Sequence, residues 1–375
     1  MKKYLFLVLF VLFHMNILFA QEKTINPLAI NSKAPDFSLP GIDDKIYTLS
    51  DFNSYDILVV MFTCNHCPTA QAYEDRIIKA VNDYRDRNVG FVGISPNNPG
   101  AISLSELSYS DMGDDLADMK RRAVDKKYNF PYLYDGEKQE ASLAYGPVAT
   151  PHVFIFNKER LLKYNGRIDD DENPYTKARQ DDMHNAIDAL LKNEEVPVAI
   201  TKTFGCSVKW AWKNEWTKKL LNDWALEPVS LEEMDIEGVK SLMRNDGQKL
   251  RLVNFWATWC GPCVIEFPDF VTINRMYRNR DFEFVSVSTD KLGKMEAALN
   301  QLKKFEASNQ NFIFSGGKIY DLIEAVDKDW QGAIPYTALI TPGGKIIYKT
   351  QGAIEPDVLK KEIVNYLGRY YADDK

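Results

Sequence analysis

Trp256-Ala257-Thr258-Trp259-Cys260-Gly261-Pro262-Cys263 is the stretch that decides the interpretation of this chain. An apolar strand pattern over residues 250–256 runs into Cys260, and a helical pattern continues from there to about residue 278. A cysteine at the start of a helix meets unpaired N–H groups and the positive end of the helix dipole, which favour a thiolate. Cys263 follows one helical turn later and can attack a mixed disulfide on Cys260. This stretch therefore predicts thiol–disulfide exchange.

A second Cys-x-x-Cys pair, Cys64-Asn65-His66-Cys67, stands in a similar segment nearer the N-terminus. An apolar strand at residues 57–62 runs into Cys64, a helical pattern extends to about residue 87, and another strand covers residues 89–94. The segment around Cys260 repeats this order and has its following strand at residues 282–287. Strand–helix–strand units call for parallel strands, so we expect the two pairs at the same structural place in two similar domains.

The repeat continues beyond these units. Pro151 precedes an apolar strand at residues 152–156, and Pro335 precedes one at residues 336–340. In both segments a turn, a further strand and a closing helical pattern follow, the last at residues 178–191 and 357–370. The sequence thus predicts an α/β protein with two tandem domains, each a mixed central sheet flanked by helices.

The length of 375 residues agrees with two domains, because one core seldom grows beyond roughly 250–300 residues. We expect a signal peptide at residues 1–20, a domain at 30–205, a Trp-rich connector at 206–227 and a domain at 228–373. The connector suits a helix that docks the two domains better than a carbohydrate- or partner-binding aromatic surface. Residues 102–118 are rich in Ser and Asp and have no counterpart in the second segment, so we expect a surface insertion there.

The N-terminus has the layout of a secretory signal. Lys2 and Lys3 precede an apolar run over residues 4–13, and Ala20 precedes polar residues. Because polar residues interrupt the apolar stretch, cleavage after Ala20 is favoured over a retained anchor, which stays the alternative. We expect export to a bacterial periplasm and a mature protein that is soluble.

Charge and cysteine usage narrow the chemistry. The net charge of −7 and the absence of a long basic block give no reason to expect nucleic acid or an anionic membrane as partner. The five cysteines form two close pairs plus Cys206. A bridge between residues three apart closes almost no loop entropy, so the pairs indicate redox chemistry and not structural cross-links. No cofactor is implied, and a zinc site, the other use of such pairs, is not expected.

The second segment, from about residue 229 to the C-terminus, resembles the exported thioredoxin-like reductases linked to cytochrome maturation. Residues 252–260 (LVNFWATWC), Glu266 and Phe267-Pro268 carry this resemblance. It implies Cys260 as the nucleophile, Cys263 as the resolving cysteine and a helix kink at Pro268. Thioredoxin has a buried Asp at the position of Asn254, which cannot titrate, so Glu266 is expected to accept the proton. A surface carboxylate is the alternative for Glu266.

Thioredoxin folds place a cis-proline beside the redox pair, and resemblance assigns Pro151 and Pro335 to that place. The residues before them, Thr150 and Ile334, would then contact an extended substrate, with Trp259 beside the second pair as a further substrate-binding residue. His152, next to Pro151, either modulates the first pair or is a satisfied edge histidine.

The first pair resembles that of strongly oxidising exported disulfide donors, because His66 precedes the second cysteine. This resemblance implies Cys64 as nucleophile, Cys67 as resolving cysteine and His66 as a modulating residue. We expect this pair to be more oxidising than Cys260/Cys263, so that electrons pass from the second domain to the first. Cys206 is either a third thiol that exchanges with this pair or a buried small apolar residue.

The rest of the first segment, at residues 34–37, 130–135 and 205–210, resembles a peroxiredoxin-like redoxin family. In that family Pro and Thr or Ser stand seven and three positions before the peroxidatic cysteine. Counted from Cys64, these positions hold Ile57 and Met61, which speaks against a peroxide pocket.

The function predicted from sequence is an exported thiol–disulfide oxidoreductase that acts by dithiol–disulfide exchange on disulfide- or thiol-bearing proteins and reduces them through the Cys260/Cys263 pair. A membrane-embedded thiol reductant is the electron donor expected from compartment and resemblance. Two alternatives stay open, a thiol peroxidase and a redox-inert module that docks client proteins.

Overall fold

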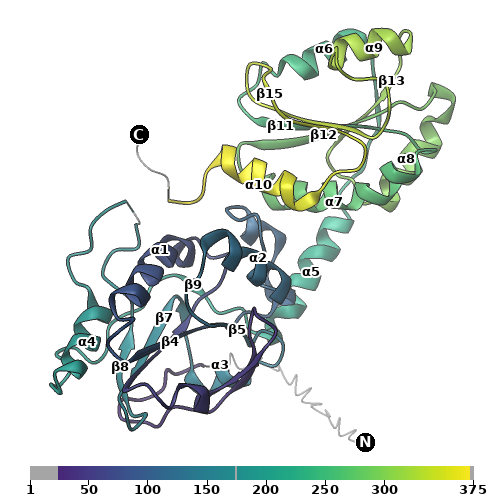
Figure 1. Cartoon of the computed structure of the whole chain (residues 1–375). Coiled ribbons are helices and arrows are strands. Elements are labelled where there is room, and N and C mark those ends of the chain that lie inside the picture. Colours follow the sequence, from purple (N-terminus) through teal and green to yellow (C-terminus); the bar gives the residue numbers. More distant parts are fainter. Residues whose placement is uncertain (1–23, 174, 372–375) are drawn as a thin grey trace, which may run out of the picture.

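A computed structural model describes residues 24–173 and 175–371. The predicted signal peptide at residues 1–20 lies outside the described residues. Figure 1 shows two α/β bodies joined by helix α5 (Asn214–Ala225). This arrangement confirms the predicted fold class.

Within the described residues, the first half is built on a mixed five-stranded sheet in the order β5-β4-β3-β7-β8. β3, β4 and β5 run parallel, whereas β7 is antiparallel to β3 and β8. The strands are β3 (Ile57–Phe62), β4 (Val89–Ser95), β5 (Tyr132–Tyr134), β7 (His152–Phe156) and β8 (Leu162–Gly166). Two short antiparallel pairs join β1 (Ser38–Pro40) to β2 (Ile46–Thr48) and β6 (Ala149–Thr150) to β9 (Cys206–Ser207).

Side chains of β3 alternate between two cores, because successive residues of a strand point to opposite faces. Val59 packs with residues of α1, α2 and α4 on one face, and Val60 packs with residues of α3 on the other. These helices are α1 (Pro68–Asp83), α2 (Leu116–Lys126), α3 (Glu140–Tyr145) and α4 (Asp182–Leu191). The helix that starts at the first cysteine pair, α1, thus rests on one sheet face.

The second half repeats this plan with a mixed six-stranded sheet, counted in the described residues, in the order β10-β13-β12-β11-β14-β15. The strands are β10 (Glu232–Met234), β11 (Leu250–Trp256), β12 (Phe282–Ser288), β13 (Gln310–Phe314), β14 (Tyr336–Ile340) and β15 (Ile346–Gln351). Helices α7, α8 and α10 cover one face, and α6 and α9 cover the other, as Figure 1 shows. They are α6 (Ile236–Arg244), α7 (Gly261–Tyr277), α8 (Met295–Lys304), α9 (Ile319–Val326) and α10 (Pro356–Leu367).

Short 3-10 helices occur in the loops between these elements. They are η1 (Leu49–Phe52), η2 (Pro99–Ala101), η3 (Leu104–Leu107), η4 (Ala211–Lys213) and η5 (Leu292–Lys294). As expected, Pro268 lies inside α7.

The connector docks on both halves. Trp210 is buried and stacks on Trp212, with ring planes 6° apart. Trp224 of α5 is buried beneath the guanidinium groups of Arg275 and Arg278 from the second half. Trp216 remains largely exposed. These contacts are those of a docking helix.

Residues 102–118 were expected to form a surface insertion, and this expectation was wrong. Ser110, Asp111 and Asp114 of this segment are buried, and η3 packs against α7. The Tyr277 hydroxyl at the end of α7 donates a hydrogen bond to the Ser110 carbonyl (2.8 Å), and Arg369 pairs with Asp111 (2.7 Å). The polar segment is buried because the second half supplies partners for Ser110 and Asp111 and the first half supplies partners for Asp114.

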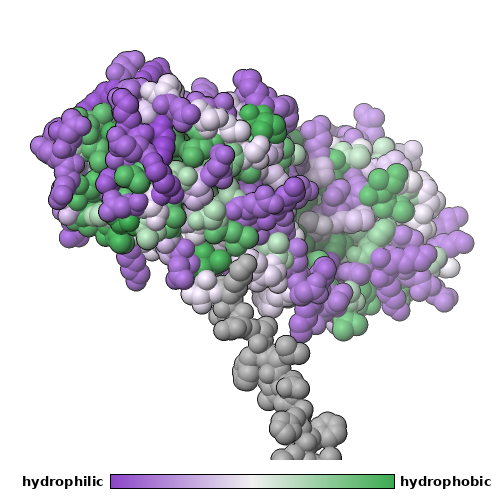
Figure 2. Space-filling model, turned by 90° about the horizontal axis from the view of Figure 1, so that it is seen from below, coloured by the Kyte–Doolittle hydropathy of each residue, from purple (hydrophilic) through white to green (hydrophobic). Residues whose placement is uncertain are grey.

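The surface carries no continuous apolar band on the face that Figure 2 shows, where hydrophobic residues lie in small groups among hydrophilic ones. Among residues 24–173 and 175–371, no helix combines the length and apolarity required to cross a bilayer.

Candidate functional site

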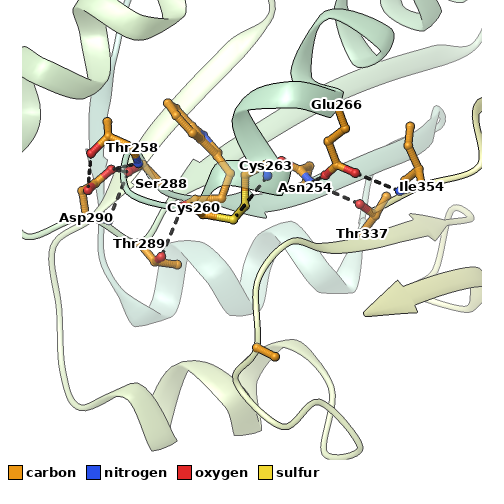
Figure 3. Close-up of a disulfide and its surroundings, with 12 residues drawn as sticks. Asn254, Thr258, Cys260, Cys263, Glu266, Ser288, Thr289, Asp290, Thr337 and Ile354 are labelled. Atoms are coloured by element: carbon orange, nitrogen blue, oxygen red, sulfur yellow. Dashed lines mark hydrogen bonds between the residues drawn. A yellow bond between two sulfur atoms is a disulfide. The ribbon is translucent and has the colours of Figure 1, made fainter. Parts of the chain in front are cut away.

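The second cysteine pair lies where β11 gives way to α7. Cys260 is the N-cap of α7, and its sulfur accepts a hydrogen bond from the Cys263 N–H (3.3 Å). A disulfide joins the two cysteines (Figure 3). Cys263 is more deeply buried than Cys260, while the neighbouring Trp259 and Ile265 are 71% and 79% exposed. A buried sulfur pair within an exposed apolar rim suits exchange with a docked polypeptide.

Glu266 lies inside the protein beneath this pair. Its side chain is 4% exposed, which excludes the surface-carboxylate alternative. One carboxylate oxygen accepts a hydrogen bond from the Ile354 N–H (2.8 Å), and the other accepts one from the Asn254 amide (3.4 Å). Burial raises the pKa of Glu266 to about 7, against the hydrogen bonds from Ile354 and Asn254, which lower it. Glu266 stands three residues after Cys263 on the same helix face, as Figure 3 shows, and is therefore placed to exchange a proton near neutral pH.

Both predicted cis-prolines are present. The Thr150–Pro151 and Ile334–Pro335 bonds are cis. Ile334 is half-buried and packs against both cores of the second half. The Pro335 carbonyl accepts a hydrogen bond from the Gly352 N–H (2.8 Å), which ties this loop to the end of β15.

The first pair stands in a different register from the second. Phe62 of β3 pairs with His152, and Phe255 of β11 pairs with Tyr336, each the residue directly after a cis-proline. Five residues beyond these phenylalanines lie Cys67 and Cys260, and each is the N-cap of its helix.

Cys67 is therefore the counterpart of Cys260, and the expected equivalence of Cys64 with Cys260 was wrong by three residues. The sequence comparison aligned the two Cys-x-x-Cys motifs, whereas the fold aligns the strands that precede them. The distance from strand end to cysteine is the sequence signal that could have revealed this.

Known proteins match each half separately. Residues 30–165 match the AhpC/TSA family, and residues 232–367 match the Redoxin family. The chain is a tandem pair of thioredoxin-like domains.

A relative named thiol–disulfide oxidoreductase ResA, from Oceanobacillus iheyensis, is 32% identical over 139 residues, which are 37% of this chain and 66% of that protein. The chain therefore spans slightly less than two thirds of this relative's length. A crystal structure of an uncharacterized conserved protein from Geobacillus kaustophilus is 34% identical and covers 50% of this chain and 94% of its own, with a TM-score of 0.44. The thioredoxin domain of a thiol–disulfide oxidoreductase from Bacteroides vulgatus is 17% identical. It covers 44% of this chain and 99% of its own, with a TM-score of 0.33. A second relative, the thiol:disulfide interchange protein HelX from Rhodobacter capsulatus, is 27% identical over 121 residues, which are 31% of this chain and 59% of that protein.

In the first domain of this tandem protein, the thiols are free and fully enclosed. Cys64 and Cys67 are both buried. Burial, a hydrogen bond to Cys67 and the negative charge of Asp114 raise the pKa of Cys64 well above its usual range. Burial also opposes ionisation of Cys67, but hydrogen bonds from Cys206 and Cys64 and the charge of His66 outweigh it and lower the pKa of Cys67 well below its usual range. The thiolate is thus favoured at Cys67, whereas the sequence assigned the nucleophile to Cys64.

His66 is held by a buried acid that the sequence did not single out. The Asp114 carboxylate lies 2.6 Å from His66 Nδ1 and accepts hydrogen bonds from the N–H groups of Asn65 (2.9 Å) and His66 (3.0 Å). Burial lowers the pKa of His66, but the charge and hydrogen bond of Asp114 outweigh it and raise the pKa. A protonated His66 next to Cys67 favours the thiolate. The consecutive acids at residues 114–115 were the available signal, but nothing local linked them to His66.

Among the described residues, Cys64, His66 and Asp114 form the group that could hold a metal ion, since each offers a ligand atom within 4.8 Å of the others. The Asp114 oxygens, however, already accept four hydrogen bonds, the fourth from the Asn97 amide (2.7 Å). A metal ion bound to Asp114 would have to displace some of these hydrogen bonds. The carboxylate is fully hydrogen-bonded by the protein itself.

The loop of the first cis-proline touches the sulfurs of Cys64 and Cys67 and the backbone of Cys206. The Thr150 hydroxyl lies 3.2 Å from the Cys64 sulfur, and the Thr150 carbonyl oxygen lies 3.3 Å from the Cys67 sulfur. The Cys206 N–H donates to the Cys67 sulfur (3.3 Å). His152, by contrast, is buried; its Nδ1 accepts a hydrogen bond from the Val148 N–H, and its Nε2 lies 2.6 Å from the side-chain amide oxygen of Asn165. His152 thus has the contacts of a satisfied histidine, although it lies in the interior strand β7 and not at a sheet edge.

Proposed function

We propose that this protein is an exported thiol–disulfide oxidoreductase that reduces disulfides in protein substrates through Cys260 and Cys263. The observation that carries the proposal is Glu266, a buried carboxyl with a pKa of about 7 located one helical turn from Cys263. A nearby group that takes up a proton at neutral pH is what a buried resolving thiol requires.

The reaction follows from the placement of these groups. The Cys260 thiolate at the N-cap of α7 attacks a substrate disulfide, and one substrate sulfur leaves as a thiolate. Glu266 then takes the proton from Cys263, whose thiolate attacks the Cys260 sulfur. The Cys260–Cys263 disulfide forms, and the second substrate sulfur leaves, so that two electrons have passed to the substrate. A dithiol reductant, for which we propose a membrane-embedded thiol protein, restores the pair.

Substrate binding is assigned to the surface around the pair. Trp259 and Ile265 are exposed apolar side chains on either side of the cysteines. The residue before Pro335, Ile334, offers backbone groups to an extended segment.

The first pair is proposed as a second redox centre, more oxidising than the C-terminal pair because His66 and the N-cap position favour the Cys67 thiolate. Since Cys64 and Cys67 are buried, a disulfide of another protein or of the second domain reaches them only after the covering segments move aside.

Insulin reduction by dithiothreitol tests the proposal. We expect the chain beginning at residue 21 to accelerate it, the Cys260→Ser/Cys263→Ser variant to fall to the uncatalysed rate, and the matched Cys64→Ser/Cys67→Ser variant to stay active. Equal activity of all three proteins at the uncatalysed rate would refute the reductase.

Thiol peroxidase is the second candidate, because the Cys67 thiolate lies in the segment matched to the AhpC/TSA family. In the corrected register, the positions seven and three residues before Cys67 hold Val60 and Cys64, so the peroxidatic pattern is again missing. Consumption of hydrogen peroxide under the same conditions distinguishes this candidate, and it must disappear in Cys67→Ser if Cys67 carries it.

A further inference from the structure

A strand of the chain itself occupies the place beside the first cis-proline where a substrate is expected. β9 pairs antiparallel with β6, and Cys206 is the partner of Thr150, the residue before Pro151. In the second domain, as far as its residues are described, no strand pairs with Ile334. Extended peptides commonly bind by adding a strand to an exposed edge, so β9 fills in the first domain the place that is open in the second.

The residue that β9 brings to the pair is a cysteine. Cys206 forms one cluster with Cys64, Cys67 and Ala70. Its N–H donates to the Cys67 sulfur (3.3 Å). The hydrogen bond and the shared cluster place Cys206 in contact with Cys67, as direct thiol–disulfide exchange requires.

The approach of β9 is built into the chain on both sides of Cys206. Gly205 has a φ of +130°, and a Cβ there would lie 2.1 Å from the Thr150 carbonyl oxygen, so only glycine allows this contact. Beyond Cys206, the Lys209 N–H donates to Asn97 Oδ1 (2.9 Å), and the Lys209 carbonyl accepts from the Asn98 N–H (2.8 Å). These contacts on both sides hold Cys206 in place next to Cys64 and Cys67.

We propose that Cys206 is a built-in substrate thiol that exchanges with the first pair, so that Cys67 is shared between two alternative disulfides. In this step the Cys206 thiolate attacks the Cys67 sulfur of a Cys64–Cys67 disulfide. The Cys67–Cys206 bond forms, the Cys64–Cys67 bond breaks, and Cys64 leaves as a thiolate that takes up a proton. One disulfide is present before and after, so no external oxidant or reductant is consumed. This goes beyond the proposed function, because insulin reduction by Cys260 and Cys263 does not involve Cys206.

Peptide mapping of the oxidised full chain tests this step. In a Cys260→Ser/Cys263→Ser background, trypsin places Cys64 and Cys67 together in residues 46–76 and Cys206 in residues 203–209. The reduced protein is oxidised with one equivalent of diamide, quenched with N-ethylmaleimide and digested without reductant. With Cys64→Ser added, we expect a disulfide between the two peptides in chains of monomer mass. At micromolar protein it should form on the order of a thousandfold faster than a link between chains, because a held pair has an effective concentration of about millimolar.

A matched control moves the thiol by one residue. In Cys206→Ser/Ser207→Cys the new thiol lies in the same peptide but points to the opposite side of β9, so the link should be lost. The chain with Cys64, Cys67 and Cys206 intact should contain both disulfides, with maleimide on Cys64 wherever Cys67 is joined to Cys206. The proposal fails if Cys64→Ser leaves Cys67 and Cys206 both labelled, if Cys67→Ser links as well as Cys64→Ser, or if the link appears only between chains.

Discussion

Replacing Glu266 by Gln should slow the second half of the exchange reaction while leaving the first half intact. A carboxyl with a pKa of about 7 is half ionised at pH 7 and can accept the Cys263 proton in that fraction of molecules. Glutamine keeps an acceptor oxygen at only one of the two positions that receive the Ile354 and Asn254 hydrogen bonds, and it cannot take up a proton. Without the base, Cys263 must ionise unaided, and only about 3% of a thiol with pKa of about 8.5 is ionised at pH 7. The expected loss is therefore about tenfold or more, since burial of Cys263 lowers that fraction further.

The assay separates the two half-reactions. In a Cys64→Ser/Cys67→Ser/Cys206→Ser background, one equivalent of a chromogenic aromatic disulfide reacts first with Cys260 and releases one coloured thiolate. Attack by Cys263 then releases the second, and stopped-flow absorbance follows each step. Glu296→Gln, an exposed site on α8, is the matched control and should behave like the parent protein.

The pH profile adds a second test of the same reasoning. Because burial raises the pKa of Glu266, the parent rate of the second release should climb through pH 7 and then level off. The Glu266→Gln rate should keep rising about tenfold per pH unit up to the thiol pKa, which closes the gap at alkaline pH. A variant that tracks the parent to within about twofold from pH 6 to pH 9 would show that Glu266 is not the proton acceptor.

Two further predictions concern the first domain. Asp114→Asn removes the partner of a buried His66, so we expect a loss of about 3–5 kcal/mol in the free energy of unfolding, measured with urea. The pKa of His66 is raised by Asp114, so it should fall in the variant, as measured by NMR titration. The stabilisation that protonated His66 gives below the ordinary histidine pKa, and that is lost above the raised one, should disappear with it. An unchanged titration would contradict this. Burial lowers the pKa of His152 from 6.5 to about 4, so stability present above pH 6.5 should be lost as pH falls to 4, by about 3 kcal/mol. His152→Gln should flatten this part of the stability profile, and an equally steep decline in the variant would assign the effect to other groups.

Much of the architecture could be read from local patterns. The apolar strands that end near each cysteine pair stand where these patterns placed them, whereas Pro268 inside α7 and the two cis-prolines were expected from resemblance. Alternating and helical periodicities report which face of an element is buried, and a strand–helix–strand order permits few topologies. Glu266 was also found from sequence, because a carboxylate one turn after Cys263 shares its helix face.

Other features depended on contacts between distant residues. The offset between Cys64 and Cys260 arises from strand pairing with β7 and β14, which motif alignment does not contain. Residues 102–118 looked like a solvent-exposed loop by composition, yet Asp114 finds His66 and Ser110 finds Tyr277. Burial of a polar segment is decided by whether partners are available, and here they come from elsewhere in the chain.

The sequence by itself determined the fold class, the tandem order and the chemistry, because each rests on residue spacing along one strand or one helix. Only the tertiary structure decided which first-domain cysteine is activated, what covers it and where Cys206 lies. Those outcomes depend on the pairing of β6 with β9 and on a buried charge at Asp114. Contacts between residues far apart in the chain produce no local periodic pattern from which they could be predicted.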